Sequence, residues 1–561
     1  MFSPFDVWQI MKRIKSNVEK RYTQKTLFHR VIRLLFANYI GMMIPLSVCL
    51  FLVYQVAPVW IHHWMFEIAL LKAPMWIAGL LTLYTAFRFM RRYVFPEEGW
   101  KGYFTPIVGS SILASLIAAS LVIAFASGAR YVQIYKDAQF KEIDILPRVS
   151  NELVRYTPVQ VAAEEIVRRT QTSQFTPGKT RPIGSSTGVA YIAPLIPQGL
   201  YNALFEQNSG FMYYDDGGTD EATQRVKTLS SDPFQWGEGM EVFDDVYRQL
   251  IQKVGFLNSY PEIYYTPVYK TDGSVQEILG VVPYISYRFW WGLLIPQWGG
   301  VAIFHADGSV ENLSPSKAAS DVRLVRTQRL FPEKLAETYI YSERYDVGDT
   351  ILEQMWYGFI RRPGKIEIPD LPGKEQMPFF LPMQDGSYSY LATVEPDGEA
   401  FSLMRVYLIN TKTGERQVYR YDKEGRPTNL QGPCKVISYV KALPNYVWHE
   451  GEGANASGTY RIIEPRPVTP DGQDHLFWML SITPADYARV VATVFVDSAT
   501  NQVFGPFTTR EQTFAWLRGE KIQTKDMMDN DVEKMCAEIQ TLWQNSCDHT
   551  QSRLVGANAQ P

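Results

Sequence analysis

The sequence predicts an α+β protein in which three N-terminal transmembrane helices precede a large extracytoplasmic body of repeated antiparallel β-hairpin units with a few covering helices. Three observations support this prediction. Long apolar segments occur only in the first quarter of the 561 residues. More than 400 mostly polar residues follow, and they are rich in the Tyr and Trp that suit β-sheet surfaces. In this second part, strand-like runs alternate with Asp-Gly and Thr-Gly turns, which are typical of hairpins.

Each apolar segment is long enough to cross a bilayer, which takes roughly 20 residues. The segments cover residues 34–60, 66–89 and 104–128. The first has no charged residue between Leu34 and Val59, and the third has none at all. The second carries Glu67 and Lys72 near its start, where both side chains can reach the interface. The alternative is two spans, with the second segment re-entrant.

Basic residues predict the orientation of these spans, because cytoplasmic flanks carry an excess of Lys and Arg. Eight Lys and Arg residues precede the first span, within residues 12–33. The first turn, residues 61–65, has none, and Arg88, Arg91, Arg92 and Lys101 surround the second turn. The N-terminus is therefore predicted to be cytoplasmic, and the residues after about 128 to be periplasmic, extracellular or lumenal.

Small residues recur along the third span and predict close helix packing in the membrane. They are Ser111, Ser115 and Ala119, with Ala114 and Ala118 beside them. The helix that packs there belongs either to a partner or to the first two spans of the same chain.

Composition and spacing divide the chain into eight predicted parts. They are a basic cytoplasmic segment (1–33), the transmembrane domain (34–128), a helical stalk (129–156), a first α+β unit (157–235), a second α+β unit (236–330), a third β unit (331–430), a fourth β unit (431–507) and a helical tail (508–561).

The four units share one pattern, in which an apolar strand is followed by a second β-rich strand, a tight polar turn and a short returning strand. The second strands and their turns cover residues 209–217, 299–308, 405–414 and 492–501. A helix with Thr157 as N-cap and Pro158 in its first position precedes the first unit, and a helix over about 240–254 precedes the second. The third and fourth units have no obvious preceding helix.

Two of these hairpins, at residues 302–310 and 407–415, resemble the terminal hairpin of PepSY-type modules. Those modules are small α+β units of extracytoplasmic bacterial proteins with a cystatin-like appearance. The resemblance implies a binding or regulatory module, and it brings no catalytic residues with it. The alternative is a generic antiparallel sheet with well-formed turns.

The most unusual stretch of the predicted body runs from Phe289 to Trp298 and also contains Trp290 and Trp291. Loops seldom carry this much apolar area without a partner, so the stretch is a candidate contact with a protein partner or a membrane surface. The alternative is that its side chains belong to the core.

No catalytic motif or metal-ligand spacing appears in the sequence, and no cofactor is predicted. The seven His residues are scattered. An acidic loop with Asp215, Asp216, Asp220 and Glu221 is a weak calcium candidate, for which a solvated loop is the alternative. With a net charge of −3, nothing in the composition points to nucleic-acid binding.

The chain has four cysteines, of which Cys49 lies in the first predicted span. Cys434, Cys536 and Cys547 lie in the predicted extracytoplasmic part, where at most one disulfide is expected.

These observations favour a non-catalytic, membrane-anchored scaffold or interaction subunit of a cell-envelope or surface assembly. Its expected partners are the membrane and other envelope proteins, and a homo-oligomer is possible. The alternatives are an envelope enzyme whose site combines scattered acids and histidines, and an accessory subunit of a membrane transport complex.

Overall fold

The computed structural model describes residues 58–63, 79, 117, 125–170, 174–185, 188–217, 226–240, 244–291, 293–324, 328–359, 365–372, 375–398, 402–423, 426, 429–449 and 458–520. The chain divides into two units, residues 1–68 and 69–561. In the first unit the described part contains one short helix, α2 (Pro58–His62). The three predicted spans lie outside the described residues except for 58–60, 79, 117 and 125–128. Among the residues that the structure describes, no helix is both long and apolar enough to cross a membrane.

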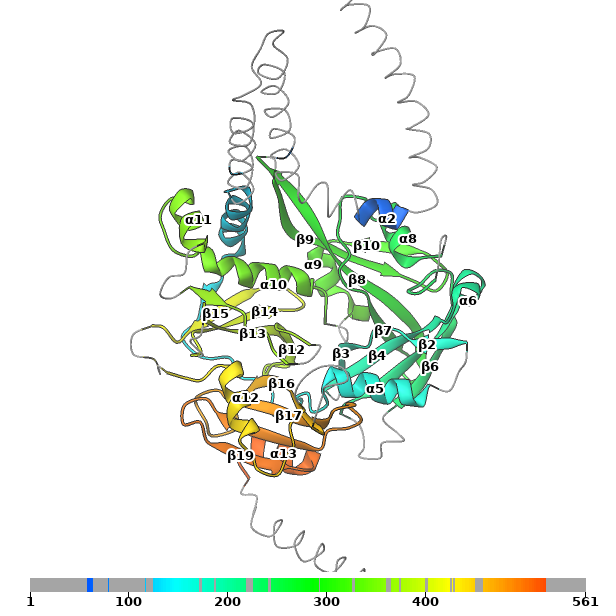
Figure 1. Ribbon diagram of the computed structural model, residues 1–561. Coiled ribbons are helices and arrows are strands. Elements are labelled where there is room, and N and C mark those ends of the chain that lie inside the picture. Colours follow the sequence, from blue (N-terminus) through cyan, green and yellow to red (C-terminus); the bar gives the residue numbers. More distant parts are fainter. Residues whose placement is uncertain are drawn as a thin grey trace, which may run out of the picture. The chain divides into compact units, whose positions relative to one another are not determined.

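The α+β class is confirmed, and the strands in the described part of the second unit form four separate sheets (Figure 1). Each sheet contains one of the four strand sets that the sequence pattern identified. In each of them the strands of the repeated pattern pair antiparallel with their neighbours along the chain, as short connections allow.

The first sheet has the order β2-β4-β5-β6, with β3 paired to β4. Its strands are β2 (Phe175–Pro177), β3 (Arg181–Ser185), β4 (Gly188–Pro197), β5 (Asn208–Asp215) and β6 (Val226–Phe234). Helix α5 (Val159–Arg169) precedes the sheet and packs on β4, β5 and β6, and α6 (Leu200–Phe205) connects β4 to β5. Pro158 is the N-cap of α5, one residue later than predicted.

The second sheet has the order β10-β9-β8-β7 and contains the longest hairpin of the described residues. Its strands are β7 (Tyr264–Tyr269), β8 (Val275–Trp290), β9 (Leu293–Phe304) and β10 (Val310–Leu313). Helix α8 (Val246–Lys253) precedes it, and α9 (Pro315–Ser320) and η2 (Val322–Leu324) follow it. Position 280 of β8 requires glycine, since a Cβ here would lie 2.0 Å from the Phe304 ring.

The third sheet has the order β1-β15-β14-β13-β11, with β12 paired to β13. Its strands are β1 (Lys141–Glu142), β11 (Ile366–Glu367), β12 (Phe379–Pro382), β13 (Tyr388–Pro396), β14 (Arg405–Asn410) and β15 (Arg416–Arg420). Strand β1 adds parallel to β15 from the segment that was predicted as a stalk.

The fourth sheet has the order β16-β17-β18-β19. Its strands are β16 (Tyr460–Val468), β17 (Phe477–Pro484), β18 (Ala492–Asp497) and β19 (Val503–Phe507). Helix α13 (Arg510–Leu517) follows β19, and its N-cap is Thr509. The rest of the predicted helical tail, after residue 520, lies outside the described residues.

Helices also precede the third and fourth sheets, so the expectation that these units lack them is wrong. The third follows α10 (Glu333–Ser342), η3 (Glu343–Tyr345) and α11 (Ile351–Phe359), and the fourth follows α12 (Pro433–Lys441). Helix α12 contains Val, Ile and Tyr, which are more common in strands than in helices. Tertiary packing outweighs this propensity, because Val436 and Val440 lie one turn apart and are both buried.

Residues 125–138 form a helix that packs against the rest of the unit rather than standing free as a stalk. Ile134 and Ala138 are fully buried in the large hydrophobic core, which includes side chains of all four sheets. Val132 contributes to a small separate cluster with Tyr345 and Met355. The end of the predicted third span is thereby joined to the folded body, by which we mean residues 125–520.

Candidate functional site

The predicted contact stretch forms the end of the β8–β9 hairpin. The two strands pair as far as Trp290 and Leu293, so residues 291 and 292 connect them. Two-residue hairpin connections favour Asn and Gly, which tolerate positive φ. Here Trp291 has a φ of +46° and is 89 % exposed, and Phe289 is 73 % exposed. A bulky aromatic residue thus occupies a backbone position with positive φ, a conformation that such residues rarely adopt.

The other two predicted contact residues point into packed surroundings. Trp290 and Trp298 are partly buried against the large core. The Trp298 ring lies 5.4 Å from the Phe331 ring in an edge-to-face arrangement, and its Nε1 donates to the Gly300 carbonyl over 3.2 Å. The exposed part of the predicted contact surface therefore consists of Phe289 and Trp291.

Several other predicted residues lie outside the described part of the chain. The transmembrane packing residues Ser111, Ser115, Ala119, Ala114 and Ala118, the acidic residues Asp220 and Glu221, and the cysteines Cys49, Cys536 and Cys547 belong to this group.

In the described part of the acidic loop, the carboxylates accept hydrogen bonds from backbone N–H groups. Both oxygens of buried Asp216 accept backbone N–H groups, from Tyr156 over 2.7 Å and from Thr157 over 3.0 Å. Asp215 accepts the N–H of Gly217 over 3.0 Å. Within the described residues, no three His, Cys, Asp or Glu side chains are placed to hold a metal ion. We therefore assign Asp216 a structural role.

The described Cys434 and histidines have ordinary structural surroundings. Burial raises the pKa of the Cys434 thiol to about 11, so it stays protonated and weakly nucleophilic at neutral pH. His305 lies between Glu277 and Glu311, at 3.3 and 2.9 Å. His475 lies 2.9 Å from Asp497.

A network of buried charges connects the segment before α5 to the third and fourth units; we call it the Arg155 network. The fully buried Arg155 guanidinium forms ion pairs with Glu375 over 2.6 Å and with Glu464 of β16 over 2.8 Å. Burial alone would raise the pKa of Glu375, but the Arg155 charge outweighs it and lowers that pKa. A buried charge is tolerated only when it is paired and hydrogen-bonded, and Arg155 meets both conditions.

Glu464 and Arg466, both fully buried on β16, complete this network. Glu464 accepts the N–H of Val159, the first residue of α5, over 3.0 Å. Arg466 donates to the carbonyls of Arg155 and, over 3.2 Å, Tyr156. The first turn of α5 and the chain before it are therefore fixed to the fourth sheet by charged groups.

Arg329 joins the first three units in the same way. It donates to the Pro182 carbonyl of β3 over 3.1 Å and pairs with Glu333 of α10. Its guanidinium lies 4.4 Å from the centre of the Tyr264 ring and 4.8 Å from that of Phe380. Both distances fall in the cation–π range.

An acid-lined cleft of about 510 Å³ lies between these two sets of charges; we call it the acid cleft. Its lining includes Glu164, Glu262, Glu333, Glu337, Glu375, Lys179, Arg181, Arg329, Tyr264 and Tyr487. Burial, and next the Glu333 charge, raise the pKa of Glu262 to about 7. Burial likewise raises the pKa of Glu333.

Glu262 could exchange a proton near neutral pH, which is what a general acid requires. Its oxygens also accept the N–H groups of Glu333 and Lys334, over 3.1 and 3.0 Å, at the start of α10. Glu262 thus caps a helix of the third unit from the second. No sequence pattern predicts this cleft, because most of its acids are far apart in the chain and share no motif spacing.

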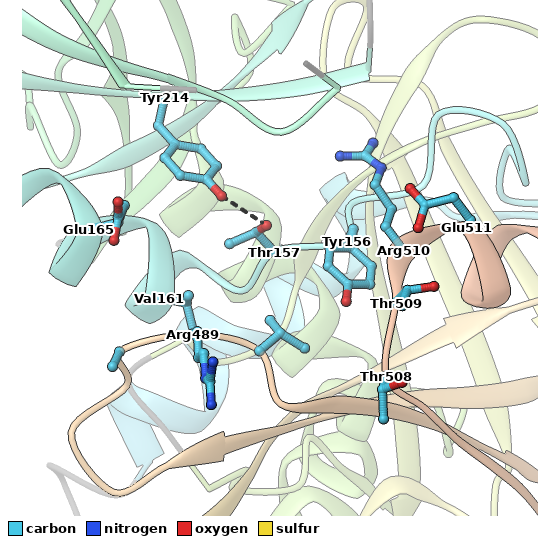
Figure 2. A pocket seen from close by; sticks show the side chains of 12 residues that line it. Tyr156, Thr157, Val161, Glu165, Tyr214, Arg489, Thr508, Thr509, Arg510 and Glu511 are labelled. Atoms are coloured by element: carbon cyan, nitrogen blue, oxygen red, sulfur yellow. Dashed lines mark hydrogen bonds between the residues drawn. The ribbon is translucent and has the colours of Figure 1, made fainter. Parts of the chain in front are cut away.

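A second cavity, of about 390 Å³, lies between the start of α5 and the loops of the fourth unit (Figure 2). Thr157 and Tyr214 contact each other across 3.3 Å on one side, and Arg510 and Glu511 lie on the other. Arg510 donates to the Asp216 carbonyl and lies over the Phe514 ring at 5.0 Å. Its guanidinium is thus engaged with the protein.

No protein-family model, no curated protein and no solved structure matches this chain.

Proposed function

We propose that this protein is a membrane-anchored, non-catalytic scaffold of a cell-envelope or surface assembly, which presents its body to protein partners. The Arg155 network is the observation that carries this proposal. It places the fully buried Arg155 and Glu464 where separate units meet, so the relative placement of these units depends on specific pairs as well as on the shared apolar core. A body whose units are held in this way suits a protein that offers fixed surfaces to others.

The membrane anchor in this proposal is the set of apolar segments 34–60, 66–89 and 104–128. The N-terminus is cytoplasmic, and the body lies on the opposite side. The resemblance of the hairpin units to PepSY-type modules agrees with a binding or regulatory role. Phe289 and Trp291 are the residues of the predicted contact stretch that remain available to a partner or surface.

Gentle detergent extraction of the tagged full-length protein, with mass spectrometry and particle size read on the eluate, tests this function. A stoichiometric set of co-purifying envelope proteins is expected. A lone monomer or homo-oligomer would contradict the scaffold role. Arg155→Met should lose these partners if the relative placement of the units is what they recognise. Arg168→Ala, which removes only an exposed ion pair with Asp486, is the matched control and should keep them.

A second candidate function, an envelope enzyme that uses acid–base chemistry, is favoured by the raised pKa of Glu262 in the acid cleft. We rank it lower because both Glu262 oxygens are engaged in capping α10. If Glu262 is a general acid, Glu262→Gln should lower turnover of a hydrolysable substrate at least about 100-fold. A variant that only loses thermal stability indicates capping alone.

A further inference from the structure

The helix at residues 125–138 carries two exposed apolar elements beside its first turns. One is the β8–β9 tip, residues 289–294, and the other is α11. In Figure 1 they flank this helix, one on each side. The charge-free segment 104–128 runs directly into the start of the same helix.

The β8–β9 tip is fixed to the helix by two polar contacts. Arg130 Nε donates to the Leu294 carbonyl over 3.0 Å, and Leu294 pairs with Phe289 across the hairpin. Arg288 forms a 2.6 Å ion pair with Asp137 further along the helix. The tip thus lies level with Arg130, and Trp291 extends beyond it toward the start of the helix.

Helix α11 reaches the same part of the helix through apolar contacts. Met355 of α11 packs with Val132 and Tyr345. The Tyr131 ring stacks on that of Tyr345 at 5.7 Å. Among the exposed side chains of α11 are Leu352, which is 60 % exposed, and Trp356, which is 64 % exposed.

The distances along the helix fit the interfacial layer of a bilayer. From the end of the charge-free segment at Gly128 to Val132 is about 6 Å at 1.5 Å per residue. The headgroup layer adds roughly 5–8 Å on each side of the hydrocarbon core. Exposed aromatic side chains at this depth match the Trp belts of membrane proteins. Arg288, which is half-exposed beside the tip, can meet lipid phosphates.

We propose that the β8–β9 tip and α11 are two membrane-interface contacts. They insert Phe289, Trp291, Leu352 and Trp356 into the headgroup layer of the membrane that anchors the chain. Two contacts on opposite sides of the anchoring helix prevent the body from tilting about it. This also explains why a tryptophan occupies the strained turn position 291. The inference rests on the membrane anchoring in the proposed function, and it assigns the predicted contact stretch to lipid.

The test is site-specific photo-crosslinking in the tagged full-length chain, in native membranes. p-Benzoylphenylalanine replaces Trp291 in one variant and Trp356 in another, and captures neighbouring C–H groups on irradiation. Tyr201 of α6 is the matched control position, because its side chain is 73 % exposed and α6 belongs to the first α+β unit, away from the β8–β9 tip and α11. Mass spectrometry of the purified protein then distinguishes phospholipid adducts from protein adducts.

We expect phospholipid adducts at positions 291 and 356 to exceed those at 201 about tenfold, since only the first two lie at the interface. A discrete protein adduct at 291 or 356, or lipid labelling no higher than at 201, overturns the inference. Thermal unfolding of each variant checks that the body is intact. We expect it to be, because substitutions at exposed positions seldom destabilise a fold.

Alkaline carbonate extraction of the same membranes separates this inference from the proposed function. If the chain stays with the membranes while positions 291 and 356 capture no lipid, the membrane anchor is supported and the proposed lipid contacts of the tip and α11 are wrong. If carbonate releases the chain, the membrane anchor of the proposed function is wrong, and the proposed lipid contacts of the tip and α11 are wrong as well.

Discussion

The Arg155 network and the β8–β9 tip are opposite in character. In the network, the side chains of Arg155, Glu464 and Arg466 are fully buried, whereas at the tip Phe289 and Trp291 are exposed. Each arrangement costs free energy in isolation, because charges prefer water and large apolar side chains avoid it. The network recovers this cost inside the protein through ion pairs. The tip has no such compensation within its own hairpin, which indicates a contact outside the protein.

Breaking the network should have the largest effect. Arg155→Met leaves Glu375 and Glu464 without their main cation, and we expect the free energy of unfolding to fall by about 3–5 kcal/mol. Chemical denaturation in detergent measures it. Adding Glu375→Gln should recover part of the loss, since the stranded charge of this carboxylate disappears. Arg168→Ala, which removes an exposed pair with Asp486, is the control and should change nothing measurable.

The two ends of the predicted contact stretch should differ clearly. Trp298→Ala removes a ring that packs on Phe331, so the free energy of unfolding should fall by about 2–3 kcal/mol. Trp291→Ala should stay within about 0.5 kcal/mol of wild type, because its side chain makes little contact with the body. Equal losses in the same denaturation assay would mean that Trp291 belongs to the core.

A buried carboxylate without a cation partner sharpens the contrast with the network. Burial raises the pKa of Glu395 to about 7, although the Cys434 N–H opposes this. The folded state therefore holds a proton that the unfolded state releases near pH 4.5. Stability from this group is complete below pH 4.5 and is lost as the pH rises through 7. Glu395→Gln should flatten this dependence and add about 1–2 kcal/mol at pH 8, as unfolding curves at pH 5 and 8 will show. An unchanged slope contradicts it.

A local interaction away from the network should have the smallest effect. Thr509 caps α13 and forms a capping box with Gln512. Thr509→Ala should cost about 1 kcal/mol and act on the fourth unit alone. Hydrogen exchange should show faster opening of α13 with unchanged protection in the first sheet. Faster exchange in both would mean that the units unfold together.

Strands were easier to predict than helices in this chain. Alternating β-rich runs with Asp-Gly and Thr-Gly turns identified one set of strands in each of the four sheets, because hairpins are encoded by neighbouring residues. Helices α10 and α12 were missed because they contain residues common in strands. The helix at 125–138 was expected as a stalk, since burial of Ile134 and Ala138 depends on distant partners.

The sequence by itself determined the local features of this protein: the hairpin pattern, the turns, the α+β class and the unusual aromatic stretch. These depend on residues close together in the chain, whose propensities and periodicity are visible without the fold. Only the tertiary structure decided that Arg155 meets Glu375 and Glu464, that Glu262 caps α10, and that Trp298 packs inward while Trp291 points outward. Each of these joins residues that are far apart in sequence or depends on which side of a hairpin is covered, so no local pattern records it.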